Sequence, residues 1–498
     1  MNRLLVHVFA VWLAAGTLQA ADRPSVVFIL ADDMGYGEIE ALNPDRSAIP
    51  TPSLNSLAEQ GRVFTDAHTT SSVCTPTRYS LLTGRYNWRT RLQRGVMVGD
   101  GDPLIAADRL TLGHLFQRQG YHTATIGKWH LNYNYQRPDA STAKGKRSRD
   151  GKAAQKRRLA AAPIGTIIPD GPMTRGFDSF YGFHHARSMG SIVRDDKIVD
   201  EVDPREVLPL LVEEATRYID ERAAASKNGQ PFLLYLPLSS PHTPIVPAED
   251  WQGRTELGDY GDFVAQTDGA VGAVIEALER NGLAEDTILF FAADNGTSKA
   301  AGIDRLQRQG HYPSGDLRGS KADLWEGGHR VPFLVRWPQR IEAGSQCDQL
   351  ICLVDMMATF AEFFDVALPD DAAEDSISFL PALLSQPQAK PRETLVHHSV
   401  TGQFAIRHDN WKLLLAPGSG GWTSPKGRAA IRAGLPEMQL YDLAEDLGEQ
   451  KNLVDAHPQR AERMIERLQQ VVAEGRSTPG QPQKNDAEID LWKRQLWK

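Results

Sequence analysis

Continuous apolar runs, rather than apolar residues that alternate with polar ones, recur along the first two thirds of the chain. Strands that are covered on both faces of a sheet have this pattern. Segments with helical periodicity separate the runs, which favours strand–helix–strand units over hairpins. The pattern therefore predicts an α/β fold with a mostly parallel central sheet flanked by helices. The runs span residues 26–30, 123–126, 232–236, 287–292 and 331–335.

Helices are expected between and after these runs, where apolar residues return at intervals of three and four positions. Gly120 and Gly282 stand where two of these patterns stop, as expected for glycine just past a helix terminus. The predicted helices span residues 112–119, 207–223, 260–280 and 353–364.

The pattern changes from about residue 385 onward. Segments 394–400, 404–407 and 411–415 predict antiparallel strands, and residues 457–475 predict a helix. A smaller C-terminal subdomain, made of an antiparallel sheet and a helix, is therefore expected. The predicted division is a signal segment over residues 1–20, a catalytic domain over 21–384 and a C-terminal subdomain over 385–498.

The first twenty residues have the features of a secretory signal. Asn2 and Arg3 precede an apolar run over residues 4–15, and Ala20 is the small residue expected before a cleavage site. The apolar run is too short for a membrane span, and no cysteine follows it to carry a lipid. We expect export to the periplasm or the medium, with no membrane partner. An uncleaved anchor is the alternative.

Net charge and cysteine content exclude two further classes of protein. The formal net charge of −8 argues against nucleic acid as a partner, and three cysteines are too few for a disulfide scaffold. Cys347 and Cys352 are expected to be buried free thiols, and a disulfide between them is the alternative. One segment, from Lys144 to Arg158, is strongly basic. It is either a solvated surface loop or an electrostatic contact for a polyanionic substrate.

Polar residues that suit catalysis follow the ends of the predicted strands. In open α/β sheets, ligands bind beyond the carboxyl ends of parallel strands, so side chains from several strands meet at one edge. The pairs Asp32–Asp33 and Asp294–Asn295 offer hard oxygen ligands, which suit Ca²⁺ better than zinc. A turn or a helix cap is the alternative for the first pair. The other polar residues near strand ends are Lys128, His130, His242 and Lys321.

The segment C-T-P-T-R from Cys74 to Arg78, followed by L-T-G-R at residues 82–85, is the most informative in the chain. Pro76 suits the first turn of a helix and Gly84 suits its end. Cys74 is then expected at the positive end of a short helix, where an anion binds well, with Arg78 one turn further on. A buried structural cysteine is the alternative.

This segment resembles the signature of the formylglycine-dependent type I sulfatases, an arylsulfatase-like family with the alkaline-phosphatase-like fold. In that family a separate maturation enzyme oxidises the signature cysteine to Cα-formylglycine. The hydrate of this aldehyde carries two hydroxyls, of which one attacks sulfur and the other later expels sulfate. The resemblance implies the same conversion at Cys74.

Further motifs extend the resemblance over nearly the whole mature chain. Lys128 and His130 lie in G-K-W-H, His242 lies in S-P-H-T-P and Lys321 lies in R-G-S-K. A stretch L-Y-D-L that is followed by N-L, within residues 440–453, is similar to one near sulfatase C termini.

The resemblance implies one bound calcium ion and a cationic pocket. Positive charge at fixed positions stabilises the negative charge that spreads over the sulfate and the leaving oxygen in the transition state. The implied metal ligands are Asp32, Asp33, Cys74 after conversion, Asp294 and Asn295, and the implied cations are Arg78, Lys128 and Lys321.

Two histidines are implied to move protons. His242 protonates the leaving oxygen, because an alkoxide is too basic to depart unprotonated near neutral pH. His130 takes a proton from the second hydroxyl when sulfate is expelled. The remaining implied residues, where relatives often build the substrate rim, are His184, His185 and Arg187.

The sequence thus predicts a calcium-dependent sulfuric ester hydrolase that removes sulfate from a carbohydrate. An aryl sulfatase is one enzymatic alternative. A phosphodiester or phosphonate hydrolase of the same superfamily is another, which would require further metal ligands. A sulfated-glycan-binding pseudoenzyme, with Cys74 left unconverted, is the alternative outside the enzymes. The identity of the sugar and the position of its sulfate stay open.

Overall fold

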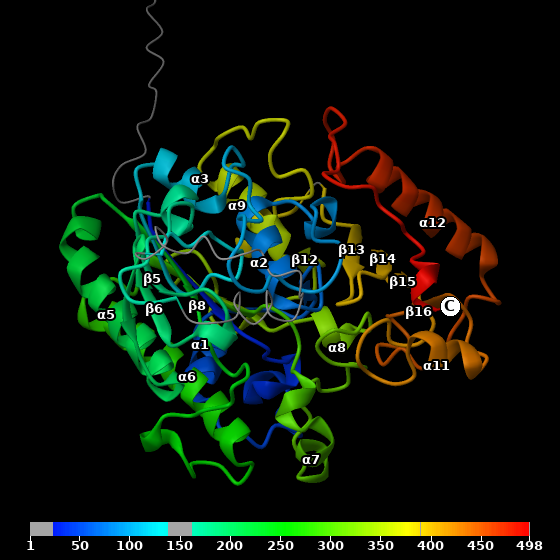
Figure 1. Ribbon diagram of the computed structural model, residues 1–498, viewed down its shortest axis with the longest axis horizontal. Helices are drawn as coiled ribbons and strands as arrows, with labels where there is room; N and C mark the ends of the chain where they lie inside the picture. Colours follow the sequence, from blue (N-terminus) through cyan, green and yellow to red (C-terminus); the bar gives the residue numbers. More distant parts are fainter. Residues whose placement is uncertain (1–22, 138–161, 389, 498) are drawn as a thin grey trace, which may run out of the picture.

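The computed structural model describes residues 23–137, 162–388 and 390–497. A large twisted sheet with helices on both faces occupies one side of the molecule, and a small sheet with its own helix lies beside it (Figure 1). The predicted signal segment and the basic run from Lys144 to Arg158 lie outside the described residues. Among the helices that the structure describes, none is both long and apolar enough to cross a bilayer.

The large sheet has ten strands, and its centre is parallel. The pairings β9·β1, β1·β8, β8·β4 and β4·β5 are all parallel, whereas β10 runs antiparallel to β9. In spatial order the strands are β11 (Ser345–Cys347), β2 (Arg62–Phe64), β10 (Phe333–Arg336), β9 (Thr287–Ala293), β1 (Ser25–Ala31), β8 (Phe232–Pro237), β4 (His122–Lys128), β5 (Ser179–Phe183), β6 (Ser191–Arg194) and β7 (Lys197–Glu201).

The predicted fold class is confirmed, and each of the five apolar runs overlaps a strand of this sheet. The sequence pattern missed strands at the edges. β6 and β7 pair antiparallel, and β7 exposes every residue except Ile198, so neither gives a continuous apolar run. In β5 the apolar pattern is interrupted by Gly182, whose backbone approaches that of Gly127 too closely for a Cβ atom.

Helices cover both faces of the large sheet, which explains the continuous apolar runs. Along β1, Val26, Phe28 and Leu30 point into one core, and the residues between them point into the other. The first core is closed by α2 (Cys74–Thr83), α3 (Leu112–Arg118) and α9 (Met356–Phe363), and the second by α1 (Pro52–Gln60), α5 (Pro204–Lys227) and α6 (Asp259–Arg280).

The predicted antiparallel sheet and helix near the C terminus are present. Leu395, Ile406 and Leu413 of this sheet pack against Met464 and Leu468 of the helix. One strand, β16, falls in the L-Y-D-L stretch, where no strand was predicted. The sheet consists of β13 (Thr394–His398), β14 (Phe404–His408), β15 (Trp411–Leu414) and β16 (Gln439–Asp442), and the helix is α12 (Pro458–Ala473).

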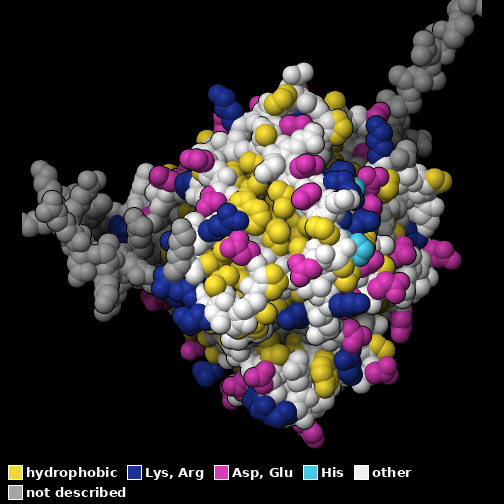
Figure 2. Space-filling model, turned by 90° about the vertical axis from the view of Figure 1, so that its right-hand side faces the viewer, with side chains coloured by type: hydrophobic (Ala, Val, Ile, Leu, Met, Phe, Trp, Pro, Cys, Tyr) yellow, Lys and Arg dark blue, Asp and Glu magenta, His cyan; other side chains and the backbone are white. Residues whose placement is uncertain are grey.

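The remaining elements are short. Cys347 in β11 and Cys352 in β12 are both free thiols, as expected. On the face drawn in Figure 2, acidic and basic side chains are interspersed around apolar ones, and neither sign dominates. The short elements are β3 (Ala67–His68), β12 (Ile351–Cys352), α7 (Ile303–Arg308), α8 (Glu326–His329), α10 (Leu380–Leu383) and α11 (Gly427–Arg432).

A buried ion network fastens the C-terminal sheet to the large sheet. The ammonium of Lys412, in β15, lies 2.8 Å from a carboxylate oxygen of Glu326 in α8 and 2.9 Å from one of Glu449. All three side chains are fully buried. Burial and the charge of Glu326 raise the pKa of Glu449 to about 7, whereas Lys412 holds the pKa of Glu326 low. Lys412 is therefore the nearest cation to Glu326, and Arg330 lies further away, at 3.6 Å.

Replacing Lys412 by alanine should lower the free energy of unfolding by about 3–5 kcal/mol, because Glu326 and Glu449 are left buried without their nearest cation. Chemical denaturation followed by circular dichroism measures this change. Lys451→Ala, at an exposed lysine of the same region, should stay within about 0.5 kcal/mol of the wild type. Equal stability of the two variants would show that the network does not fasten the sheet.

Candidate active site

Two parallel strands deliver four oxygen-bearing side chains to one point. β1 and β9 are in register up to Ala31 and Ala293, so Asp32–Asp33 and Asp294–Asn295 leave the sheet side by side. The Asp33 amide donates to Asp294 Oδ1 at 3.2 Å, and Asn295 Nδ2 donates to Asp33 Oδ1 at 2.8 Å. All four side chains are buried. The predicted convergence of these two pairs is present.

The donor set of this group fits a hard cation. Asp32 Oδ1, Asp33 Oδ2 and Asn295 Oδ1 are buried and have no hydrogen-bond partner among the described residues. Buried oxygens without a partner are costly, so such a set points to a ligand. Burial and the neighbouring charge of Asp32 also raise the pKa of Asp294 to about 7. A divalent cation with oxygen ligands, such as Ca²⁺, would relieve both costs.

Cys74 is the first residue of α2, and its thiol lies beside the oxygen cluster. The helix ends where predicted, because Gly84 adopts a left-handed conformation with φ 65° at its C-cap. Burial raises the pKa of the Cys74 thiol to about 12, so the thiol stays protonated and is a poor nucleophile. Lys321 Nζ lies 3.6 Å from Cys74 Sγ.

Each predicted cation is paired with one carboxylate of the cluster. Arg78 donates from Nε and Nη2 to Asp294 Oδ2, at 3.1 and 2.7 Å. Lys128 Nζ donates to Asp32 Oδ2 at 2.5 Å, and Lys321 Nζ donates to Asp33 Oδ1. The three cations come from α2, from β4 and from the segment before α8, so charge pairing ties these elements together.

Each of the two predicted proton-transfer histidines has one ring nitrogen held by a backbone carbonyl. His242 Nδ1 is hydrogen-bonded to the carbonyl of Thr243, and its Nε2 lies 3.6 Å from Asp33 Oδ2. His130 Nε2 is hydrogen-bonded to the carbonyl of Met97 at 2.9 Å, and its Nδ1 has no partner among the described residues. Burial lowers the pKa of His130, so this ring is neutral and Nδ1 can accept a proton.

These side chains open into a cavity of about 720 Å³. Cys74, His130, His242 and Lys321 line it, whereas Arg78, Lys128 and the metal-ligand candidates are buried behind them. The cavity walls also include His185, Arg187, Met189, Val400 and Trp422.

The structure separates the three predicted rim residues. His185 and Arg187 line the cavity. His184 does not; it is buried, and its Nε2 is hydrogen-bonded to Asn132 Oδ1 at 3.0 Å. Trp422 was not singled out from the sequence, because a lone tryptophan in a Gly- and Ser-rich segment gives no pattern. Only the return of the C-terminal segment to the cavity brings Trp422 there.

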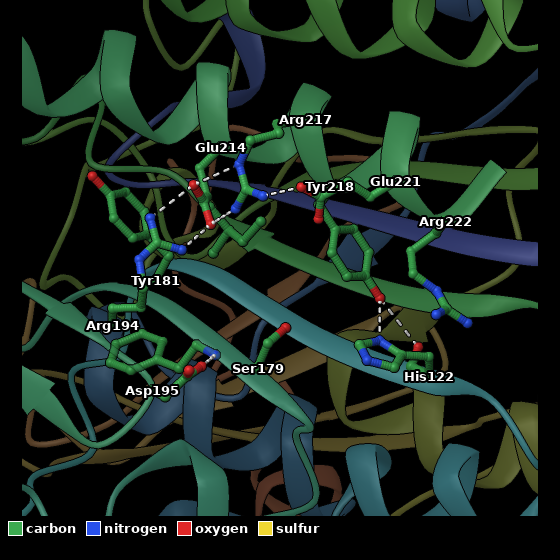
Figure 3. A pocket seen from close by; sticks show the side chains of 12 residues that line it. His122, Ser179, Tyr181, Arg194, Asp195, Glu214, Arg217, Tyr218, Glu221 and Arg222 are labelled. Atoms are coloured by element: carbon green, nitrogen blue, oxygen red, sulfur yellow. Dashed lines mark hydrogen bonds and ion pairs between the residues drawn. The ribbon is translucent and has the colours of Figure 1, made fainter.

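Another cavity, of about 310 Å³, lies between α5 and strands β4 and β5 (Figure 3). Its charged side chains neutralise one another: Glu214 pairs with Arg194 at 2.6 Å and with Arg217. The charged groups of this cavity therefore favour an ion-pair cluster over a catalytic site.

A buried group of histidines, His68, His329 and His397, also brings possible metal ligands together. The ammonium of Lys412 lies 3.0 Å from His329 Nε2, and His68 Nε2 is 2.8 Å from Asp66 Oδ1. A cation therefore already occupies this polar group, which belongs to the network that fastens the C-terminal sheet.

Known proteins resemble the chain over nearly its whole length. It matches the sulfatase family over residues 24–366, and the C-terminal family of N-sulphoglucosamine sulphohydrolase over residues 320–417. An N-acetylgalactosamine-6-O-sulfatase of Bacteroides thetaiotaomicron is 28% identical, over 91% of this chain and 94% of that protein. Arylsulfatase A of Bos taurus is 30% identical, over 92% of this chain and 89% of that protein.

A solved structure from a study of glycosaminoglycan metabolism by B. thetaiotaomicron has the same fold. It superposes with a TM-score of 0.74 at 24% identity, over 90% of this chain and 99% of that one. Since the family match covers more than half of the chain, and the site holds the signature segment at the edge of an alkaline-phosphatase-like sheet, the chain belongs to the sulfatase family and is an enzyme that hydrolyses sulfate esters.

Proposed function

We propose that this sulfatase is exported, removes sulfate from a carbohydrate, and uses a formylglycine made from Cys74 together with one calcium ion. The observation that carries the proposal is the position of Cys74 at the start of α2, with Lys321 Nζ 3.6 Å from its sulfur and the unpartnered oxygens beside it. The N-acetylgalactosamine-6-O-sulfatase relative supports a carbohydrate substrate. The arylsulfatase A relative supports a small aryl ester as the second candidate.

The state of Cys74 argues for conversion. A thiol whose pKa is raised to about 12 supplies almost no thiolate near neutral pH. Formylglycine, once hydrated, would supply a hydroxyl for attack on sulfur. The first turn of α2 offers free backbone N–H groups and the positive end of the helix dipole, which favour a bound sulfate at this point.

The side chains around Cys74 would supply charge stabilisation and proton transfer. Lys321, Lys128 and Arg78 hold positive charge where the sulfate gains negative charge, and their pairing with carboxylates fixes their positions before substrate binds. His242 donates a proton from Nε2 to the leaving oxygen. The Thr243 carbonyl holds the hydrogen on Nδ1, so His242 donates as the imidazolium; burial lowers the pKa of this ring and the carboxylate of Asp33 raises it. His130 accepts a proton at Nδ1, because its Nε2 hydrogen is held by Met97.

Asp32, Asp33, Asp294 and Asn295, with the converted Cys74, would hold the calcium ion. When bound, the ion would neutralise part of the charge on the sulfate group. Oxygen ligands without histidine favour calcium over zinc. A phosphohydrolase with two zinc ions would need histidines in place of Asn295.

The nucleophile assignment is tested by Cys74→Ala, made in a host that contains the maturation enzyme. Mass spectrometry of the wild-type peptide around Cys74 should show formylglycine. Turnover of sulfate esters should be lost in the variant, while binding of a sulfated saccharide stays measurable because the cations remain. Undiminished activity of Cys74→Ala would falsify the assignment.

Lys321→Ala should lower kcat by about 10²–10³ with a smaller effect on KM.

The metal assignment is tested by chelation. The stripped enzyme should be inactive, and Ca²⁺ should restore activity better than Zn²⁺. Adding Ca²⁺ should also raise the thermal midpoint of the wild type, because a ligand that binds only the folded state stabilises it. Asp33→Asn should lose this rise, whereas Asp304→Asn, at an exposed carboxylate of α7, should keep it. Stoichiometric zinc with little calcium would favour the phosphohydrolase instead.

The role of His242 is tested by the leaving group. His242→Ala should lower kcat by about 10²–10³ on a sulfated sugar, whose alkoxide needs a proton. On 4-nitrophenyl sulfate the loss should stay below about tenfold, since that leaving group departs unprotonated. His408→Ala, in β14 of the C-terminal sheet, should change neither rate. Equal losses on both esters would assign His242 to positioning rather than to proton transfer.

A further inference from the structure

Trp422 is an aromatic side chain left exposed at the catalytic cavity. It keeps 38% of its surface exposed and lines the same cavity as Cys74. The other large apolar side chains that are exposed in the described part of the chain are aliphatic: Val98, Ile164, Val199 and Ile431. Ligand pockets are lined mainly by apolar and aromatic side chains, so an exposed indole on the wall of this cavity suits a bound ligand.

The backbone at Trp422 is held firmly in place. Asp323 Oδ1 accepts hydrogen bonds from the amides of Trp422 and Thr423, at 2.8 and 2.9 Å. The Trp422 carbonyl accepts one from Lys299 Nζ and one from Lys426 Nζ, each at 2.9 Å. Asp323 itself is buried.

This anchoring reaches the catalytic residues. Asp323 lies two residues after Lys321, whose ammonium contacts Asp33 and Cys74. Gly421 packs against the same segment so closely that a Cβ atom would lie 2.1 Å from the carbonyl of Ala322. The backbone that carries the indole therefore has a fixed position relative to Cys74. A rigid aromatic surface binds its ligand with little loss of conformational entropy.

Arg187 presents an uncompensated charge in the same cavity. Its side chain is exposed, and no carboxylate among the described residues pairs with its guanidinium. Its backbone amide donates to His185 Nδ1 at 3.0 Å, which ties it to a second residue of the cavity wall. Arg78, Lys128 and Lys321, by contrast, are each paired with an aspartate. A planar guanidinium suits a carboxylate or a sulfate.

We propose that Trp422 and Arg187 form a subsite for the sugar unit next to the one that carries the cleaved sulfate. The apolar face of that ring lies on the indole, and a second anionic group, a carboxylate or a sulfate, pairs with Arg187. The substrate is then an acidic oligosaccharide rather than a simple sulfated monosaccharide. The cavity of about 720 Å³ has room for more than one ring. The inference rests on the proposed carbohydrate sulfatase activity.

The test compares converted enzyme on three substrates that share the cleaved sulfate. They are a monosaccharide, a disaccharide without other charge, and a disaccharide with a carboxylate on the neighbouring ring. Trp422→Ala should lower kcat/KM about three- to tenfold on both disaccharides, mainly through KM, and leave the monosaccharide unchanged. Trp422→Phe should keep most of the activity. Ile431→Ala, which removes an exposed apolar side chain of α11, is the matched control.

The same substrates separate the role of Arg187. Arg187→Ala should lower kcat/KM about tenfold on the carboxylated disaccharide only, and the salt dependence of that reaction should weaken. Arg187→Lys should recover part of the loss. Arg432→Ala, at an exposed arginine of α11, should have no effect. Calorimetry with the same disaccharide in a Cys74→Ala background should show matching losses of affinity.

The outcomes distinguish failure of the proposed subsite from failure of the proposed carbohydrate sulfatase activity. If the wild type hydrolyses sulfated saccharides but Trp422→Ala affects all three substrates equally, or none, the subsite is overturned and the sulfatase activity stands. If Arg187→Ala affects both disaccharides alike, the second anion is overturned. If enzyme with a converted Cys74 hydrolyses no sulfated saccharide yet cleaves an aryl sulfate, the proposed carbohydrate activity fails, and the subsite fails with it.

Discussion

The structure depends on one constraint: the aspartates buried together at the ends of β1 and β9 must each be paired with a cation. Parallel register places Asp32, Asp33 and Asp294 together out of water, an arrangement that is unstable unless cations accompany it. Arg78, Lys128 and Lys321 meet that need from three different elements. The fold therefore cannot close without assembling the cationic pocket that the chemistry requires.

The start of α2 is positioned by the same charges. Arg78 donates both to Asp294 and to the carbonyl of Lys128, so it holds the N-terminal half of α2 against the ends of β9 and β4. Cys74 then has one possible place, at the floor of the cavity and beside the unpartnered oxygens. Its burial makes the thiol a poor nucleophile, which is consistent with the proposed conversion to formylglycine.

The C-terminal part of the chain both packs against the rest of the fold and contributes a wall of the cavity. Lys412 ties β15 to α8, and Asp323 ties the Trp422 segment to the segment before α8 that carries Lys321. Both contacts join residues nearly a hundred positions apart in the sequence. The catalytic cavity is thus closed by two parts of the chain, and the second part offers the surface on which different sulfated substrates would be distinguished.

The sequence alone was enough for the α/β class, the five strands that the apolar runs predict, the antiparallel C-terminal sheet and the convergence of the candidate catalytic residues, because burial on both faces and strand-end chemistry leave local patterns. It did not reveal edge strands such as β7, whose exposed residues give no apolar run. Tertiary structure alone decided that His184 lies behind the cavity while His185 and Trp422 line it. Whether a side chain lines the cavity depends on contacts between distant segments, such as that of Trp422 with Asp323. No local sequence pattern encodes those contacts.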